Sequence, residues 1–361
     1  ILPPSWIITM ESPTSVVPPS LVVALRVGLN AFVTRGALWC VLLWWLPAGC
    51  LSSKSTSAEP VTRLQPLLGT FVSVTVYAEP DEAQSAINAA FAEIRAVDRL
   101  LSIHRDDSDL AKANQGKAVS AELKPVLKQA LAIARETEGA FDPTIRPLAE
   151  LWGFIKKEGY RLPTKTELQS VLPKVDYRQI KLQGNKLIQN APGMSIDSGG
   201  FGKGYAVDRA IAVLQRHGIR HAMVKAGGDT RVIGLPPGLD HWAVWIEDPR
   251  KQGRRTLIKL RRGALSTSGN YENFFEIDGR RYGHLLDPRT GYPVQGIGSC
   301  TATAATCMES DAYATAACVL GVAHSKQLLG AKVGFRFLLF PETDPEGPLK
   351  VVETDRFPGS D

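Results

Sequence analysis

The chain has 361 residues, a net charge of +6 and five cysteines. A chain of this length can bury the core of one large domain or of two interlocked ones. Its positive charge is spread out, apart from one cluster between Arg250 and Arg262, and no basic stripe with interleaved aromatic residues is present. This pattern favours a solvated face over a nucleic-acid-binding surface.

The first 50 residues have the pattern of an export signal. Arg35 precedes an apolar run at 37–46, which is short for a membrane span but suits the core of a signal peptide. Small residues directly before Cys50 indicate lipoprotein processing, although Pro47 also leaves an uncleaved signal anchor open. We expect upstream residues and a lipoprotein signal at 1–50, lipid on Cys50, and a polar tether at 51–62 that holds an exported, periplasmic protein at the inner membrane.

Periodicity predicts strands and helices in mixed order along the rest of the chain. Alternating β-prone residues predict a strand at 69–77, and a long amphipathic helix follows at 80–101. Thr164 and Glu167 form a capping box that begins a short helix. Further helices are expected at 121–138, from about 204 to 217, and at 310–320, and further strands at 186–189, 221–225, 231–234, 242–247, 256–260, 265–268, 281–286, 299–306 and 335–340. Because no regular βα alternation is present, we expect an α/β fold of the mixed, α+β kind rather than a doubly wound sheet.

The most informative stretch is 196–208, in which four glycines within six positions surround Lys203 ahead of an amphipathic run. Glycine lets a backbone approach a ligand closely, and the start of a helix attracts anions, phosphate above all. The stretch fits neither a Walker A loop nor a Rossmann fingerprint. Asp197, just before the glycines, suits a site that holds a metal or contacts a neutral edge of the ligand. A glycine turn that only packs a helix against a sheet is the alternative.

Two further sets of residues could carry chemistry. Asp311 and Thr315 are four residues apart on a predicted helix, so their oxygens share one face and suit Mg²⁺; helix capping is the structural alternative. His284 follows a predicted strand and can act as a general base, contact a phosphate, or be structural. With the glycine turns at 226–229 and 266–271, this mixture suits an enzyme that acts on a phosphate or pyrophosphate through a metal.

Three cysteines lie close together near the end of the chain: Cys300, Cys307 and Cys318. No Cys-x-x-Cys pair is present, so a zinc site is not expected. Export would permit a disulfide among them, and buried free thiols are the alternative.

These motifs together resemble the FAD:protein FMN transferases, the ApbE family. The resemblance runs from about residue 65 to 340 and rests on eight motifs in the same order. They lie at 68–70, 102–114, 139–144, 197–208, 227–229, 267–271, 284–291 and 311–315. The resemblance implies the family's α/β architecture, related to the T-fold, with a flavin site between two interlocked subdomains. The domain would span 63–345 and be followed by a tail at 346–361.

The resemblance also implies a reaction and its site. A threonine hydroxyl of a partner flavoprotein would attack FAD at the phosphorus on the FMN side, AMP would leave, and FMN would stay on the partner through a phosphoester bond. Mg²⁺ would sit on Asp311, Thr315 and the carbonyl of Gly200, and His284 would take the threonine proton or stabilise the phosphate. The FAD pocket would include Leu68, Ser102, Ala140, Phe141, Asp142, Asp197, Lys203 and Leu285. Leu68 and His104 stand where many members carry Met and Tyr.

The implied acceptors are subunits of membrane redox complexes, such as sodium-pumping NADH:quinone reductases, and other exported flavoproteins. Two other functions stay open at this point. One is an FAD pyrophosphatase that releases free FMN, with water as the nucleophile. The other is a lipoprotein that binds FAD without catalysis.

Overall fold

The structure, a computed structural model, describes residues 59–359 except 157, 249, 251–254, 272 and 342–346. The expected export signal at 1–50, with Cys50, and most of the tether at 51–62 lie outside the described residues. Val61 and Thr62, at the end of the expected tether, already belong to the first strand. Within the described ranges, no helix has the length and apolar character needed to cross a membrane.

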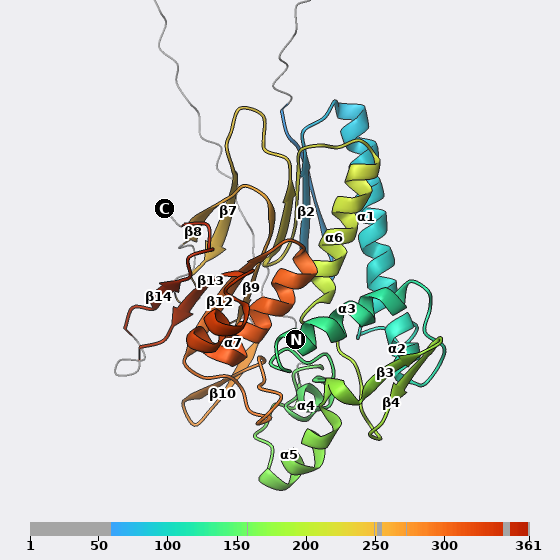
Figure 1. Cartoon of the computed structure of the whole chain (residues 1–361), viewed down its shortest axis with the longest axis vertical. Helices are drawn as coiled ribbons and strands as arrows, with labels where there is room; N and C mark the ends of the chain where they lie inside the picture. The colour runs from blue at the N-terminus through green and yellow to red at the C-terminus, as the bar shows by residue number, and fades with distance from the viewer. Residues whose placement is uncertain are drawn as a thin grey trace, which may run out of the picture. The chain divides into compact units, whose positions relative to one another are not determined.

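A single antiparallel sheet of eight strands organises the domain (Figure 1). Each strand pairs antiparallel with its neighbour. Its strands are, from edge to edge, β1 (Val61–Leu67), β2 (Thr70–Val76), β5 (Ala222–Ala226), β6 (Asp229–Ile233), β9 (Gly263–Gly269), β12 (Ile297–Ala304), β13 (Gly334–Leu339) and β14 (Lys350–Glu353). Strand β14 comes from the stretch that the sequence sets apart as a tail, so the sheet extends beyond residue 345.

Three hairpins stand outside this sheet. They are β3 (Ile180–Gln183) with β4 (Lys186–Gln189), β7 (Trp242–Glu247) with β8 (Arg255–Leu260), and β10 (Phe274–Ile277) with β11 (Arg280–Gly283). The strand predicted at 281–286 is shorter than expected, because the chain leaves the hairpin at Gly283 and His284 begins the wall of a cavity.

The helices are α1 (Pro80–Leu101), α2 (Asp109–Asn114), α3 (Leu123–Glu136), α4 (Arg146–Leu151), α5 (Lys165–Val171), α6 (Gly202–Arg216) and α7 (Cys307–Leu329). Helix α1 has the predicted bounds, and α5 begins at the predicted capping box of Thr164. Helix α7 is longer than predicted, because a second capping box, of Thr306 with Glu309, begins it early. At its other end the helical run continues past a kink at Gly321, whose φ is 72°. The mixed α/β class is confirmed.

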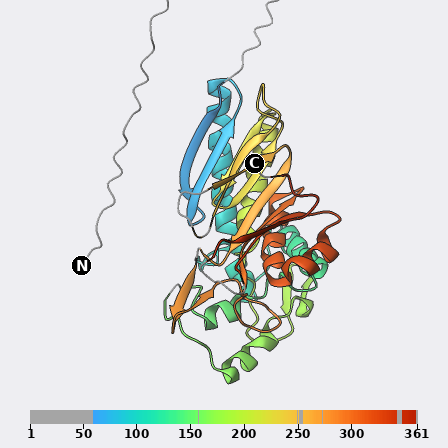
Figure 2. The same cartoon turned by 90° about the vertical axis from the view of Figure 1, so that its left-hand side faces the viewer.

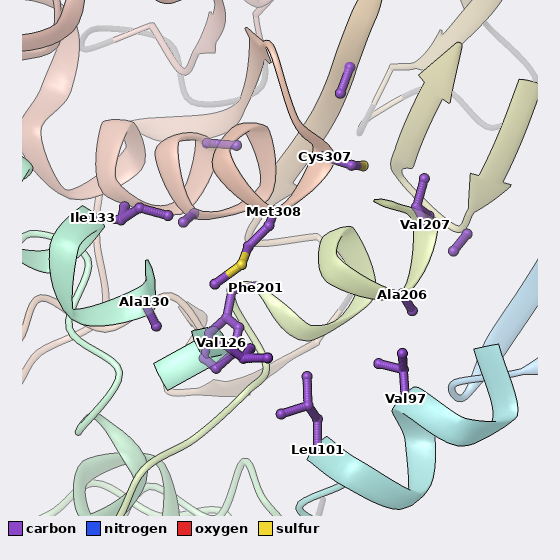
Figure 3. Packing of buried hydrophobic residues seen from close by; sticks show 14 of the residues in the cluster. Val97, Leu101, Val126, Ala130, Ile133, Phe201, Ala206, Val207, Cys307 and Met308 are labelled. Carbon is purple, nitrogen blue, oxygen red and sulfur yellow. The ribbon is translucent and has the colours of Figure 1, made fainter. Parts of the chain in front are cut away.

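Most of the apolar residues form one large core between the sheet and helices α1, α3, α6 and α7. Helices α1 and α6 run side by side in Figure 1. Figure 3 shows the point where the four helices meet, with Phe201 before α6, Met308 of α7 and Leu101 of α1 pointing inward. Burying a side chain of this size contributes about 1.5–3 kcal/mol, so this junction fixes the start of α6 relative to the start of α7.

Two smaller cores complete the domain. One surrounds Trp152 and joins α4 and α5 to the β10–β11 hairpin. These elements lie together at the lower end of the sheet in Figures 1 and 2. The other core packs the β7–β8 hairpin against β6 and β9 through residues that include Trp242 and Ile258. The core around Trp152 is separate from the large one, and the candidate site lies where the two come together.

Candidate active site

A cavity of about 270 Å³ lies between the large core and the core around Trp152. It brings together nearly all of the site residues expected from the sequence, from four separate segments of the chain. Those that line it are Ala140, Phe141, Asp142, Asp197, Gly200, Lys203, His284, Leu285, Asp311 and Thr315. Leu68 and Ser102 are not among its lining residues.

The glycine-rich stretch before α6 is held in place by hydrogen bonds from distant segments. The Asn114 side chain accepts from the backbone N–H of Ile196 at 2.8 Å and donates to the carbonyl of the same residue at 2.9 Å. Ser198 Oγ donates to the carbonyl of Leu101 at 2.7 Å, and the N–H of Asp197 donates to that of Pro143 at 2.7 Å. The loop is therefore fixed before any ligand enters, which lowers the entropic cost of binding.

Asp197 sits at the inner end of this loop and is 7% exposed. Its Oδ1 accepts a hydrogen bond of 2.6 Å from the N–H of Gly199. Burial raises the pKa of Asp197, while that hydrogen bond and the charges of Arg146 and His104 act against the rise. The carboxylate is thus positioned by the loop and faces the cavity.

Two buried carboxylates and one ammonium group form the charged centre of the site. Asp229 and Asp311 are 2% and 4% exposed. Lys203 Nζ lies 3.2 Å from Asp229 Oδ2 and 3.9 Å from Asp311 Oδ2, so it bridges the two. Asp311 Oδ2 also accepts from the N–H of Gly204 at 3.2 Å. A buried carboxylate is stable only beside a positive charge. Residues of α6, α7 and the start of β6 therefore form a candidate cation site.

Thr315 lies one turn after Asp311 on α7, and its oxygen faces the glycine loop. Thr315 Oγ1 is 3.1 Å from Ser268 Oγ. A Cβ added to Gly200 would lie 3.5 Å from Thr315 Oγ1, so the loop backbone borders this hydroxyl. One carboxylate, hydroxyls and a backbone carbonyl are hard oxygen donors, and a magnesium ion keeps several waters besides them. Within the described ranges, no group of three or more His, Cys, Asp or Glu side chains is arranged to hold a metal.

His284 enters the cavity from the side of the β10–β11 hairpin. Its Nδ1 lies 3.1 Å from the carbonyl oxygen of Asn273, and its backbone N–H donates to the same oxygen at 3.0 Å. Because a carbonyl oxygen only accepts, Nδ1 carries the hydrogen, and in the neutral imidazole the lone pair is then on Nε2. The Phe154 ring packs edge-on against the imidazole, with 6.4 Å between the ring centroids. These contacts hold the ring in one orientation.

Asp142 has a structural task in addition to its place in the cavity wall. Its Oδ1 accepts from the N–H and the Oγ1 of Thr144 at 2.8 and 2.6 Å, and its Oδ2 accepts from the N–H of Tyr177 at 2.9 Å. Burial raises the pKa of Asp142, and these hydrogen bonds oppose the rise. The carboxylate therefore ties the 140–144 turn to the segment before β3.

Leu68 and Ser102 lie at the ends of regular elements and do not line the cavity. Leu68, with φ of 56°, forms the β1–β2 turn and packs against the large core. Ser102 ends α1, and its neighbours Ile103 and His104 line the cavity instead. The sequence gives no signal for Phe154 or Asn273, because an isolated apolar residue and a backbone carbonyl have no motif.

Cys300, Cys307 and Cys318 are buried free thiols, and burial raises the pKa of each.

Comparisons with known proteins show the family and the fold of the chain. The family model described as "ApbE family" matches residues 68–338. The FAD:protein FMN transferase of Vibrio cholerae is 33% identical over 287 residues, covering 76% of this chain and 85% of that protein. The one of Treponema pallidum is 31% identical over 348 residues, covering 89% and 94%.

Solved structures show the same likeness. The ApbE protein of Thermotoga maritima superposes with a TM-score of 0.75 at 31% identity, covering 82% of this chain and 97% of that one. The flavin transferase ApbE from Vibrio cholerae gives a TM-score of 0.74 at 29% identity, covering 83% and 98%. The family match spans most of the chain, and the fold is shared along nearly the full length of the solved relatives. The chain belongs to the ApbE family.

Proposed function

We propose that this chain transfers FMN from FAD to a threonine hydroxyl of a partner protein and releases AMP, with Mg²⁺ as its metal. The relatives named as FAD:protein FMN transferases support the flavin-transfer reaction. The observation that carries the proposal is that His284, Lys203, Asp311 and Thr315 line one cavity. Phosphoryl transfer depends mainly on positioning and on neutralising charge, and these four side chains are suited to both tasks.

The donor set fits a hard divalent cation. Asp311, Thr315 and the carbonyl of Gly200 would hold Mg²⁺, because all three supply oxygen and Asp311 is a buried carboxylate. When bound, the ion would polarise phosphate oxygens and offset their negative charge. The Lys203 ammonium, which forms ion pairs with Asp311 and Asp229, supports a cation at this place.

The chain's own residues supply the remaining requirements. His284 takes the proton of the threonine hydroxyl at Nε2, while Asn273 keeps the hydrogen on Nδ1. The threonine oxygen then bonds to the phosphorus of the FMN half, the bond from that phosphorus to the bridging oxygen breaks, and the bridging oxygen leaves with AMP. General-base assistance of this kind is worth about 10²- to 10⁴-fold in rate. The fixed glycine loop and Lys203 orient the diphosphate.

We also propose that the protein is exported and held at the periplasmic face of the inner membrane by lipid on Cys50. The support is the apolar run and the small residues before Cys50 in the sequence. The acceptor would then be a subunit of a membrane redox complex or an exported flavoprotein. Replacing Cys50 with alanine should move the protein from the membrane to the soluble fraction, and an unchanged membrane fraction would contradict lipid attachment.

Product analysis tests the reaction. The enzyme is incubated with FAD, Mg²⁺ and a soluble acceptor domain from a sodium-pumping NADH:quinone reductase that bears the target threonine, and the nucleotides are separated by chromatography. We expect one AMP for each FMN that remains with the acceptor, and loss of both products with EDTA. Free FMN in the same amount as AMP would instead identify a pyrophosphatase. Bound FAD with no product would identify a binding protein.

A further inference from the structure

A second cavity, of about 430 Å³, lies on the face of the sheet turned away from the large core. Alternation along β5 places it there: Val224 is buried in the large core, so Lys225 points to the opposite face. The same holds for Val74 and Ser73 on β2. Residues of β7 form the outer wall, and we call this cavity the strand-face groove.

The rim of the strand-face groove is apolar and open to solvent. Phe71 is 65% exposed, Leu64 60% and Trp245 48%, and all three line the groove. They come from β2, β1 and β7, so strands far apart in the sequence gather large apolar side chains on one surface. A cluster of this kind at the mouth of a cavity marks an interaction site more often than single scattered residues do. Aromatic anchors are also the side chains that dominate binding energy at protein interfaces.

The floor of the groove carries two polar side chains, Thr230 and Lys225. Thr230 is 1% exposed and lines the groove, and its Oγ1 has no hydrogen-bond partner among the described residues. Beside it, Lys225 pairs in register with Thr230 across β5 and β6. Lys225 is half-buried; burial lowers the pKa of its ammonium, and the carboxylate of Glu247, which also lines the groove, acts against that lowering. A buried hydroxyl and a half-buried ammonium together favour a ligand that offers oxygen acceptors, including a carboxylate.

The groove adjoins the candidate active site. Thr267 of β9 lines both cavities, and its backbone N–H donates to the carbonyl of Gly228 at 3.2 Å. The Gly227–Gly228 turn between β5 and β6 therefore forms the edge that separates the groove from the catalytic cavity. The next residue, Asp229, is the partner of Lys203. The groove and the charged centre therefore lie on either side of this turn, and Thr267 borders both cavities.

We propose that the strand-face groove binds an extended segment of the acceptor protein next to its target threonine, with apolar side chains on the exposed rim and a carboxylate on Lys225. This rests on the proposed function, because it assigns the place of the second substrate. An extended segment fits since the groove is lined by strands and its polar floor lies between apolar walls. The catalytic cavity holds the flavin substrate, so the acceptor needs a surface of its own.

Steady-state kinetics with matched variants test this proposal. Phe71→Ala and Lys225→Met should each raise the KM for the acceptor domain about tenfold, the size of effect expected for an interface anchor, while the Kd for FAD stays at the wild-type value. Leu64→Ala and Leu239→Ala form a matched pair, because the two leucines are 60% and 59% exposed and only Leu64 lines the groove. The first should raise the KM and the second should not. Melting temperatures show that the variants are folded.

A photo-crosslinker separates this proposal from the proposed function. A benzoylphenylalanine at position 245 should crosslink to the acceptor domain in the presence of FAD, and one at position 239 should not. Crosslinking does not require FMN transfer. It therefore tests whether the acceptor binds in the groove even if the wild-type enzyme releases free FMN. Equal KM values for the Leu64 and Leu239 variants, or no crosslink at position 245, would overturn the assignment of the groove.

Discussion

Gly204 lies in close contact with the start of α7, on the helix that also bears Lys203. A Cβ at this position would lie 2.3 Å from the carbonyl oxygen of Cys307 and 2.6 Å from its carbonyl carbon. Both atoms belong to the backbone at the start of α7 and cannot rotate away. Ordinary van der Waals contact begins near 3.4 Å, so Gly204→Ala must push the start of α6 and the start of α7 apart by about 1 Å.

Two energies of opposite sign set the size of the effect on stability. Replacing glycine with alanine inside a helix raises the free energy of unfolding by about 1 kcal/mol. Overpacking against a rigid neighbour lowers it by about 3 kcal/mol or more. The net loss is about 2–4 kcal/mol, which for a domain of this size lowers the melting temperature by about 4–8 °C. A displacement of about 1 Å at the reacting groups can also lower activity about 100-fold.

Gly202, two residues earlier in the same helix, provides the control. A Cβ there would lie 3.2 Å from the Cβ of Ser198, so the neighbouring side chain has to move by only a few tenths of an ångström. Gly202→Ala should therefore leave the melting temperature within about 2 °C of the wild type, since the helix gain offsets the contact. Differential scanning fluorimetry and the AMP-release assay measure both variants. A Gly204→Ala protein as stable and as active as the Gly202→Ala protein would refute the packing argument.

Three further predictions concern charged and titratable groups of the site. Lys203→Met removes the cation between Asp229 and Asp311, so the metal-free protein should melt at a lower temperature, and added Mg²⁺ should raise the melting temperature more than in the wild type; equal rises would contradict this. His284→Gln should lower kcat by about 10²- to 10⁴-fold with the Kd for FAD unchanged, as measured by flavin fluorescence and AMP release, and a change in Kd alone would argue against a base. Burial raises the pKa of Asp197, so its charged form is costly in the folded state above that pKa and the cost disappears below it. Asp197→Asn should therefore be more stable than the wild type at pH 8, and this difference in unfolding free energy, measured by urea titration, should shrink as the pH falls towards the usual carboxyl pKa of about 4. A difference that grows as the pH falls would show that the carboxylate is stabilised when charged.

Local patterns in the sequence predicted the elements whose causes are local. Helix α1 has the predicted bounds because its apolar residues recur at helical spacing over six turns, and α5 begins at a capping box that spans four residues. Helix α7 was predicted too short, because the Thr306–Glu309 capping box went unrecognised and because Gly321 kinks the helical run without ending it.

Long-range pairing explains what the sequence did not show. Strand β14 lies in the expected tail and is a strand only because β13 offers it an edge. Asn114 clamps Ile196 from 82 residues away, and Lys203 meets its partner Asp229 through the pairing of β5 with β6 and the packing of α6. The candidate residues were identified by their types and order, but their assembly in one cavity depends on these contacts.

The most direct test of the central claim is the intact mass of an acceptor domain after incubation with FAD and Mg²⁺. With the wild-type enzyme, the acceptor should gain the mass of one FMN on a threonine, and peptide sequencing by tandem mass spectrometry should place it there. With Asp311→Ala, the gain should disappear while the enzyme remains folded. An unmodified acceptor with the wild-type enzyme, or a full gain with Asp311→Ala, would contradict the account.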